Sequence, residues 1–274
     1  RQPMSLRRCT ESDRAAILSY IAAEPEINLF IYGDIESVGV DRDPVHVFVP
    51  AGEAAGQWSG LLLQYYENYL YYSCDPGADL APFVEFLQGR RVENLNAKGE
   101  LAHRLAPYFP TLRPTDAHMS RCNAETCAPA GPLPAGLSVR RFGKAEVDEV
   151  LELLRGVEEF SDTYRGDPRE RERMARHLDM GGMIYGGCLD GRLVATAQTT
   201  AASSRSAMVI SVATRPDARG RGYASAVVSA LCRDNFAAGR QFLCLFYDNP
   251  AAGRIYHRIG FRDVGVYTIM SAAR

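Results

Sequence analysis

The chain has 274 residues and a formal net charge of −2, from 31 lysines and arginines against 33 aspartates and glutamates. Hydrophobic residues make up 46% and charged residues 23%, which is typical of a folded protein and excludes an intrinsically disordered one. The length suffices for two ordinary domains. The balanced charge predicts no nucleic-acid partner, and no apolar run could span a bilayer, so we expect no membrane segment and no leader peptide.

The first part of the chain predicts alternating strands and helices. Residues 5–18 (SLRRCTESDRAAIL) indicate a short strand that ends in two arginines, a polar cap and an amphipathic helix. Strands are expected at 46–49 (HVFV) and, as a pair, within 58–74 (WSGLLLQYYENYLYYSC). A turn, a helix, a strand, a second helix and a last strand should follow.

The same order then recurs. Residues 123–136 (NAETCAPAGPLPAG) contain three prolines and no periodicity, which predicts a linker. After it, 138–151 (SVRRFGKAEVDEVL) repeats the pattern of 5–18, and strands are expected at 183–189, 192–200 and 207–214. A repeat of half the chain length predicts two duplicated α/β domains, at 1–122 and 137–274, each a mixed sheet flanked by helices.

A basic turn marks the second half. Residues 215–222 (RPDARGRG) place Arg215, Arg219, Arg221 and two glycines before an apolar run with helical spacing. A helix N-terminus offers unpaired N–H groups and partial positive charge, and glycine lets a ligand approach the backbone closely. The pattern predicts a diphosphate cradle, with a glycine turn and solvated arginines as the alternative.

The corresponding turn of the first half is acidic. It offers Asp75 and Asp79 in place of the three arginines. An acidic turn repels the anion that a basic turn attracts, so if one chemistry was duplicated, we expect the first half to have lost it.

A strand and a short helix complete the second half. The first helix should end near Gly239, and 241–248 (QFLCLFYD) predicts a buried strand. In 249–261 (NPAAGRIYHRIGF) we expect a helix with Asn249 as its N-cap and Gly260 at its C-terminus. Spacing alone leaves Tyr256 open between a packing aromatic and a functional hydroxyl, and Asn249 open between a cap and a ligand contact.

These residues resemble the GNAT superfamily of acyl-CoA N-acyltransferases. The resemblance covers residues 137–274 and rests on two motifs, Arg219-x-x-Gly222-x-Ala224 and Asn249-Pro-x-Ala252-x-x-x-Tyr256-x-x-x-Gly260-Phe261. The first half resembles a degenerate GNAT domain by its order of elements alone. The whole chain is therefore similar to tandem-GNAT proteins in which one half keeps acetyl-CoA binding.

The resemblance implies a role for each matching residue. The basic turn would wrap the pyrophosphate of acetyl-CoA, the backbone of Val212 and Thr214 would pair with the pantetheine arm, and the Val212 N–H would face the thioester carbonyl. Asn249 would contact the arm, and Tyr256 would reach the sulfur as the catalytic residue. The implied cofactor-binding set is Val212, Thr214, Arg219, Gly220, Arg221, Gly222, Tyr223, Ala224, Ser225 and Asn249.

The implied reaction is direct attack of a primary amine on the acetyl thioester, which needs a route for the amine proton. Many relatives use a carboxylate on the central strand, but 206–214 (SAMVISVAT) has none. Ser211 could hold a water, and Glu158, Glu159 or Asp162 could reach in from the acceptor side. These acids are also typical of a solvated helix end, so the base stays unassigned.

Two alternatives remain open at the level of sequence. One is a dinucleotide-binding oxidoreductase, since Gly220-x-Gly222 opens a helix after a strand, although Ser225 replaces the third glycine of that motif. The other is a non-catalytic acyl-CoA sensor or scaffold.

The remaining expectations concern partners and location. The acceptor is expected to be a small-molecule or peptide amine of unspecified identity, and the oligomeric state is not specified either. Seven scattered cysteines with no zinc-site spacing predict reduced thiols, no metal and a cytoplasmic location.

Overall fold

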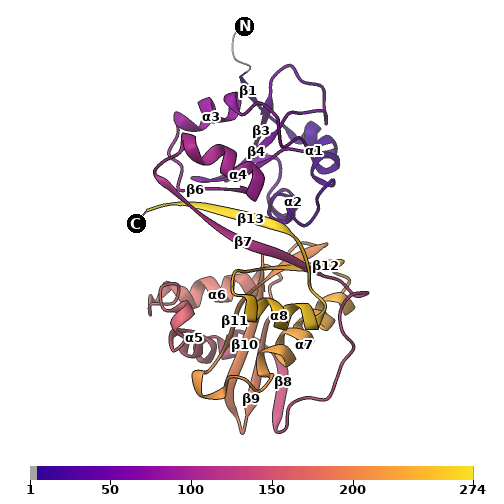
Figure 1. Cartoon of the computed structure of the whole chain (residues 1–274), viewed down its shortest axis with the longest axis vertical. Coiled ribbons are helices and arrows are strands. Elements are labelled where there is room, and N and C mark those ends of the chain that lie inside the picture. The colour runs from indigo at the N-terminus through magenta and orange to yellow at the C-terminus, as the bar shows by residue number, and fades with distance from the viewer. Residues whose placement is uncertain (1–4, 274) are drawn as a thin grey trace. The chain divides into compact units, whose positions relative to one another are not determined.

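The computed structural model describes residues 5–273. By its contacts the chain divides into two units, one of Arg1–Met119 with Val264–Arg274 and one of Ser120–Asp263. Residues 1–4 and 274, the outer ends of the two predicted halves, lie outside the described residues. Figure 1 shows the helices and strands of both units.

The second unit is a mixed sheet flanked by helices. Neighbouring strands from β8 to β11 are antiparallel, whereas β11 and β12 are parallel. In sheet order its strands are β8 (Leu137–Phe142), β9 (Ile184–Leu189), β10 (Arg192–Thr200), β11 (Ser206–Thr214) and β12 (Phe242–Tyr247). Its helices are α5 (Val147–Arg155), α6 (Arg169–Asp179), α7 (Tyr223–Ala237) and α8 (Pro250–Ile259), with 3₁₀ turns η3 (Lys144–Glu146), η4 (Glu158–Phe160) and η5 (Pro216–Ala218).

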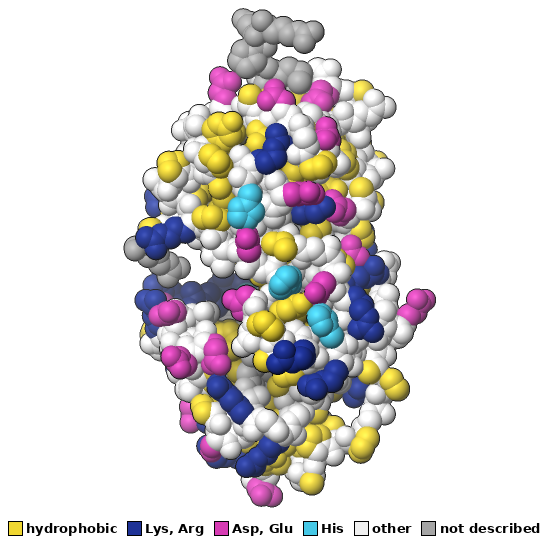
Figure 2. All heavy atoms as spheres, viewed as in Figure 1, with side chains coloured by type: hydrophobic (Ala, Val, Ile, Leu, Met, Phe, Trp, Pro, Cys, Tyr) yellow, Lys and Arg dark blue, Asp and Glu magenta, His cyan; other side chains and the backbone are white. Residues whose placement is uncertain are grey.

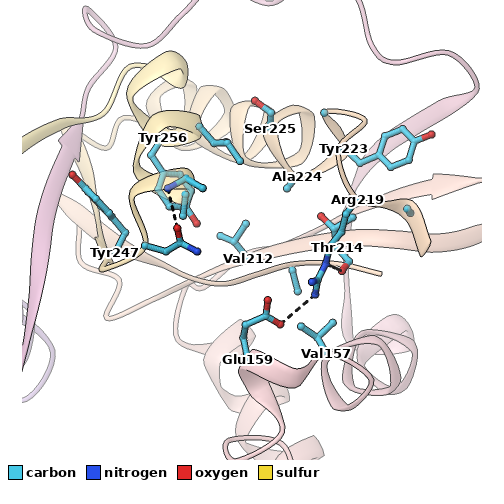
Figure 3. Close-up of a pocket in the computed structure, with 18 of the residues that line it drawn as sticks. Val157, Glu159, Val212, Thr214, Arg219, Tyr223, Ala224, Ser225, Tyr247 and Tyr256 are labelled. Carbon is cyan, nitrogen blue, oxygen red and sulfur yellow. Dashed lines mark hydrogen bonds and ion pairs between the residues drawn. The ribbon is translucent and has the colours of Figure 1, made fainter. Parts of the chain in front are cut away.

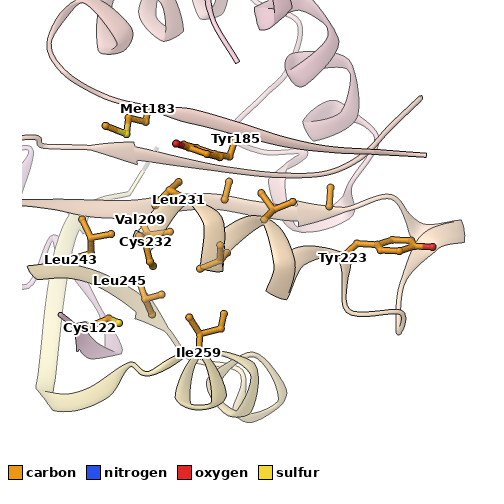
Figure 4. Packing of buried hydrophobic residues seen from close by; sticks show 14 of the residues in the cluster. Cys122, Met183, Tyr185, Val209, Tyr223, Leu231, Cys232, Leu243, Leu245 and Ile259 are labelled. Carbon is orange, nitrogen blue, oxygen red and sulfur yellow. The ribbon is translucent and has the colours of Figure 1, made fainter. Parts of the chain in front are cut away.

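Two apolar clusters hold this unit together. Because strand side chains alternate in direction, Leu193 packs with α5 and its neighbour Val194 packs with α7. The larger cluster, drawn in Figure 4, joins α7 and α8 to the sheet through fully buried residues such as Leu231 and Leu243. This packing fixes the positions of α7 and α8 relative to β11.

The strand β11 departs from regular geometry in two ways. Its parallel pairing with β12 covers only Ser206–Met208, opposite Phe242–Cys244, so the two strands have no registered pair beyond that point. Its pairing with β10 shifts register between Thr196 and Gln198, and Ser211 has a positive φ of 52°. The shift sets two residues of β11 against one of β10, which is a β-bulge.

The first unit repeats this design. Its strands from β1 through β3 and β4 to β5 pair antiparallel, and β5 pairs with β6 in parallel over three residues of each. Its strands are β1 (Leu6–Arg8), β2 (Asp41–Arg42), β3 (Val45–Pro50), β4 (Leu61–Tyr65), β5 (Asn68–Tyr72), β6 (Asn94–Lys98) and β7 (Leu112–Cys122). Its helices are α1 (Arg14–Ile21), α2 (Leu29–Ser37), α3 (Ala81–Gln88) and α4 (Gly99–Leu105), with 3₁₀ turns η1 (Glu11–Asp13) and η2 (Ala106–Tyr108).

The last strand of the chain returns to the first unit. β13 (Arg262–Ala272) pairs antiparallel with β6, from Tyr267 opposite Lys98 to Ser271 opposite Asn94. Residues 264–274 therefore group with the first unit by contact, although the sequence repeat assigns them to the second half.

The predicted fold class, a mixed sheet with flanking helices in each of two tandem units, is confirmed. The order turn, helix, strand, helix is present after β5 and after β11, and residues 123–136 contain no helix or strand. The sequence patterns did not reveal α2 and α6. Within residues 5–273, no helix is both long enough and apolar enough to cross a membrane.

The pairing of β13 with β6 makes β13 part of the first unit. Met270 is 0% exposed there, while its neighbour Ile269 is 37% exposed. We expect Met270→Ala to lower the free energy of unfolding by about 2–4 kcal/mol through the cavity it leaves. Ile269→Ala, the matched control, should cost less than about 1 kcal/mol. Equal unfolding temperatures for the two variants would show that β13 lies outside the cooperative core.

Candidate functional site

A pocket of about 640 Å³ lies in the second unit where β11 and β12 diverge. Its walls come from the ends of these two strands, the turn before α7, the start of α8 and the segment after α5 (Figure 3). Ten of the eleven predicted site residues line it: Val212, Thr214, Arg219, Gly220, Gly222, Tyr223, Ala224, Ser225, Asn249 and Tyr256. The size is that of a typical small-molecule site.

The turn before α7 has the geometry of an anion cradle. Gly220 and Gly222 have positive φ values of 78° and 80°, a conformation that residues with a Cβ adopt only at a cost. α7 begins at Tyr223, no side chain caps it, and the first bond of its helical ladder runs from the Ala226 N–H to the Gly222 carbonyl. The preceding amides therefore project from a helix N-terminus that carries partial positive charge.

The three arginines of the turn have different surroundings. Arg215 donates to the Leu193 carbonyl at 2.5 Å and is thereby bound to β10. Arg219 lines the pocket, where its guanidinium lies 3.2 Å from the Glu159 carboxylate (Figure 3). Arg221 is exposed and is not among the pocket-lining residues. Of the three, Arg219 is the cation placed to meet a bound anion.

The end of β11 contributes backbone to the pocket beyond its pairing with β12. Val212 and Thr214 line it, beyond the last residue that β11 pairs with β12. Ser211 and Val212 also fall in the register shift opposite β10. An extended ligand could pair with this edge as an added strand would.

The helix α8 closes the far end of the pocket. Asn249 caps it by accepting a hydrogen bond from the Ala251 N–H at 2.9 Å, and Gly260 ends it with a φ of 125°. A Cβ at Gly260 would lie 2.1 Å from the Thr126 carbonyl oxygen, so this position excludes other residues. Both caps match the sequence prediction.

Tyr256 projects from α8 into the pocket (Figure 3). Burial raises its pKa to about 12, so the phenol stays protonated at neutral pH. Its ring is 6.3 Å from Tyr247 and 6.0 Å from Phe261, centroid to centroid. The hydroxyl is thus a proton donor on a ring that packing holds in place.

Several lining residues were not predicted. They include Phe246 and Tyr247 at the end of β12, Ile255 and Arg258 on α8, and Phe160 after α5. Tyr247 donates a hydrogen bond to Asp263 at 2.7 Å, and His257 contacts the same carboxylate at 2.9 Å. The run of 241–248 shows only a buried strand, and the divergence from β11 is what turns its last residues toward the pocket.

The candidate bases differ in placement. Glu159 lines the pocket and is paired with Arg219, whereas Asp162 is exposed and 3.6 Å from Arg165. Ser211 shares a hydrogen bond of 2.8 Å with the Tyr164 hydroxyl. Among the residues that the structure describes, no group of three or more His, Cys, Asp or Glu side chains could hold a metal ion.

The first unit fills its corresponding region with its own side chains. Asp79 accepts a hydrogen bond from the Ala81 N–H at the start of α3, which occupies a place where an anion would bind. Where β5 and β6 end, Glu24 accepts from the Tyr72 hydroxyl at 2.8 Å and from Lys98 at 2.7 Å. The carboxylate of Asp79 in the acidic turn therefore has a hydrogen-bond partner within the protein.

Comparison with known proteins agrees with this geometry. Residues 147–261 match the model of the acetyltransferase (GNAT) family. A search of curated proteins found no significant match. The part of the second unit that carries the sequence motifs is thus similar to the GNAT family.

Solved structures extend the likeness to the whole chain. A Drosophila protein from a structural genomics consortium is 14% identical with a TM-score of 0.74, and the match covers 98% of this chain and 99% of that one. A GCN5-related N-acetyltransferase from Sphaerobacter thermophilus is 19% identical with a TM-score of 0.64, covering 98% and 95%. A tandem GNAT protein from the clavulanic acid biosynthesis pathway is 15% identical with a TM-score of 0.59, covering 98% of each chain. The fold is a tandem GNAT fold.

The segment between α5 and α6 depends on one buried carboxylate. Glu170 is 3% exposed, and it accepts hydrogen bonds from Arg155 at 2.9 Å and from the Arg165 N–H at 2.7 Å. Burial alone would raise the pKa of Glu170, but these donors outweigh it and hold the pKa below its usual value. This carboxylate fixes the segment that carries Glu159 and Tyr164.

We expect Glu170→Gln to lower the free energy of unfolding by about 1–3 kcal/mol at pH 7. Since the folded pKa is depressed, the carboxylate stabilises the protein above the unfolded pKa of about 4.3, and this contribution is lost as pH falls through the folded pKa. Denaturant unfolding at pH 7 and near pH 3 should therefore show the difference from the native chain shrinking in acid. Glu172→Gln, on the exposed side of α6, is the control. A deficit that stays constant with pH would exclude the charge as its cause.

Proposed function

We propose that this protein transfers an acetyl group from acetyl-CoA to a primary amine by direct attack. The observation that carries the proposal is the single pocket region that joins the arginine-glycine turn, the unpaired edge of β11 and Tyr256. The turn suits a diphosphate, the edge of β11 suits an extended amide arm, and the Tyr256 hydroxyl suits a departing thiolate.

The binding part of the proposal follows the length of the pocket. The amides at the start of α7 and the Arg219 guanidinium would hold the pyrophosphate, because charge-assisted donors and a helix N-terminus both favour phosphate oxygens. The backbone of Val212 and Thr214 would pair with the amides of the pantetheine arm. Binding of pyrophosphate to Arg219 would compete with its ion pair to Glu159.

The chemical part requires three groups. The amine nitrogen forms a bond to the acetyl carbon, the carbonyl oxygen takes the negative charge, and the carbon–sulfur bond then breaks. The Val212 N–H is the donor we assign to that oxygen, and one such donor is worth about 3 kcal/mol in a dry site. The Tyr256 hydroxyl supplies the proton to sulfur, and the amine proton leaves through water, which returns a proton to Tyr256.

The proposal extends to partners and location. We assign the acceptor to small-molecule or peptide amines, which enter from the side of Val157, Glu159 and Phe160. We further propose a cytoplasmic location, on the ground that the seven cysteines are scattered and odd in number. The oxidoreductase alternative fits poorly, because a dinucleotide-binding fold is an open parallel sheet, whereas the described pairings from β8 to β11 are all antiparallel.

Calorimetric titration with CoA tests the binding part. We expect one site per chain, located in the second unit. Arg219→Glu should weaken CoA at least about tenfold, as expected for loss of a charge-assisted contact. Arg221→Glu is the matched charge reversal outside the pocket lining and should weaken CoA less. S-acetylpantetheine, which lacks the pyrophosphate, should bind both variants equally.

Other results would redirect the assignment. Two equivalent CoA sites would overturn the assignment to one unit. If Arg219→Glu lost equal affinity for CoA and for S-acetylpantetheine, Arg219 would not be a contact of the pyrophosphate. Preference for NAD over CoA would favour the oxidoreductase, and binding without CoA release across a panel of amines, amino acids and aminoglycosides would favour the sensor.

Tyr256→Phe tests the chemical part. Because the hydroxyl acts mainly in the transition state, kcat should fall while the affinity for acetyl-CoA stays the same. A thiol pKa of about 8.5 lets thiolate leave without full protonation, so we expect a fall of about tenfold to a hundredfold, smaller at higher pH. Release of free CoA measures the rate. Tyr185→Phe, which removes a hydroxyl that donates to Asp234 away from the pocket, should leave kcat unchanged. A phenylalanine variant as fast as the native chain would return Tyr256 to a packing role.

A further inference from the structure

The bulge at Ser211 changes which way β11 presents its side chains. Before it, Ala207 and Val209 face the cluster under α7, and strict alternation would send Ser211 and Ala213 to the same side. Instead Val212 packs on the α7 side and Ala213 on the α5 side. The extra residue therefore reverses the alternation at the point where β11 enters the pocket.

The conformation that produces this reversal is unfavourable by itself. Ser211 has a φ of 52°, in the left-handed region that residues with a Cβ avoid. Such a residue persists where its surroundings hold it there, and it is found often at functional sites. Ser211 needs a contact that fixes it.

Tyr164 provides that contact. Its hydroxyl lies 2.8 Å from the Ser211 Oγ, and its ring packs on the α5-side cluster, 6.2 Å from Phe160. Burial raises the pKa of Tyr164, so its hydroxyl keeps the proton that a hydrogen bond requires.

The backbone of Tyr164 is itself anchored on both sides. Its N–H donates to the Phe160 carbonyl at 2.8 Å, and the next N–H, that of Arg165, donates to the buried Glu170 carboxylate at 2.7 Å. A chain of contacts therefore runs from Glu170 through Tyr164 to Ser211, next to Val212. A rigid support of this kind is what a precisely aimed donor requires.

We infer that Tyr164 is a positioning residue for acyl transfer, because its hydroxyl holds Ser211 in the bulge that presents the Val212 amide to the pocket. The inference rests on the proposed function, in which that amide donates to the thioester carbonyl. Val212 lines the pocket and has no registered partner on β10 or β12. Tyr164 does not line the pocket, so we assign its effect to its contact with Ser211.

The infrared carbonyl band of bound acetyl-CoA, labelled with ¹³C at the acetyl carbonyl, measures this directly. In the native chain we expect the band at lower wavenumber than in free acetyl-CoA, because a hydrogen bond from Val212 weakens the C=O bond. Tyr164→Phe keeps the ring and removes the hydroxyl, and it should return the band most of the way to the free position. The Kd for acetyl-CoA should change by less than about threefold, since the loss falls on the reacting carbonyl.

Two further variants make the result specific. Ser211→Ala removes the other half of the hydrogen bond, so it should match Tyr164→Phe, and the double variant should show no additional change. Tyr185→Phe is the control, a tyrosine on β9 whose hydroxyl donates to Asp234. If the band is shifted in the native chain and keeps the same shift in Tyr164→Phe, the inference is overturned. Acetyl-CoA binding would stand in that case.

A ligand-free measurement separates this inference from the proposed function. Without its clamp, the bulge should exchange between conformations, so the amide resonances of Ser211 and Val212 should broaden in Tyr164→Phe and stay sharp in Tyr185→Phe. Sharp resonances in both variants would overturn the role of Tyr164 whether or not acetyl-CoA binds. Failure of the native chain to bind acetyl-CoA would instead overturn the proposed function.

Discussion

The divergence of two parallel strands is the constraint on which the site depends. β11 and β12 share only three registered pairs, and beyond Met208 the edge of β11 turns away from its neighbour. Backbone N–H and C=O groups that leave a sheet ladder need other partners, either water or a ligand. The pocket, the exposed strand edge and the position of Tyr256 all follow from this one separation, because α7 and α8 cover the space that it opens.

Packing keeps the separation open. α7 and α8 are joined to the sheet by fully buried residues such as Val227, Leu231 and Phe261, so neither helix can move into the gap without exposing apolar surface. On the other side, Tyr247 packs against Gly253, where a Cβ would lie 2.5 Å from its ring. Each strand is thus held in place by the helix that packs on it.

The sequence predicted elements where local chemistry is strong. Gly220 and Gly222 before an apolar helix, and Asn249-Pro250 before another, are local signals, and the structure has the expected φ angles and cap at each. α6 was missed because most of its residues are charged and only Met174 among them is a buried hydrophobic. Neither the divergence of β12 nor the bulge at Ser211 has a local signal, since both arise from how strands pair. Tyr247 and Tyr164 could therefore not be recognised from the sequence.

In the first unit, side chains of the protein itself fill the space where the two parallel strands diverge. β5 and β6 also pair over only three residues, but Glu24 bridges Tyr72 and Lys98 just beyond them. Asp79 meets the amide at the start of α3, and Arg104 binds the carbonyls of Pro76 and Ala78 in the turn. The end of the β5–β6 pairing and the turn before α3 thus have internal partners. The fold obliges every such gap to be filled, and whether the filling is a side chain or a substrate depends on the residues at its edges rather than on the fold itself.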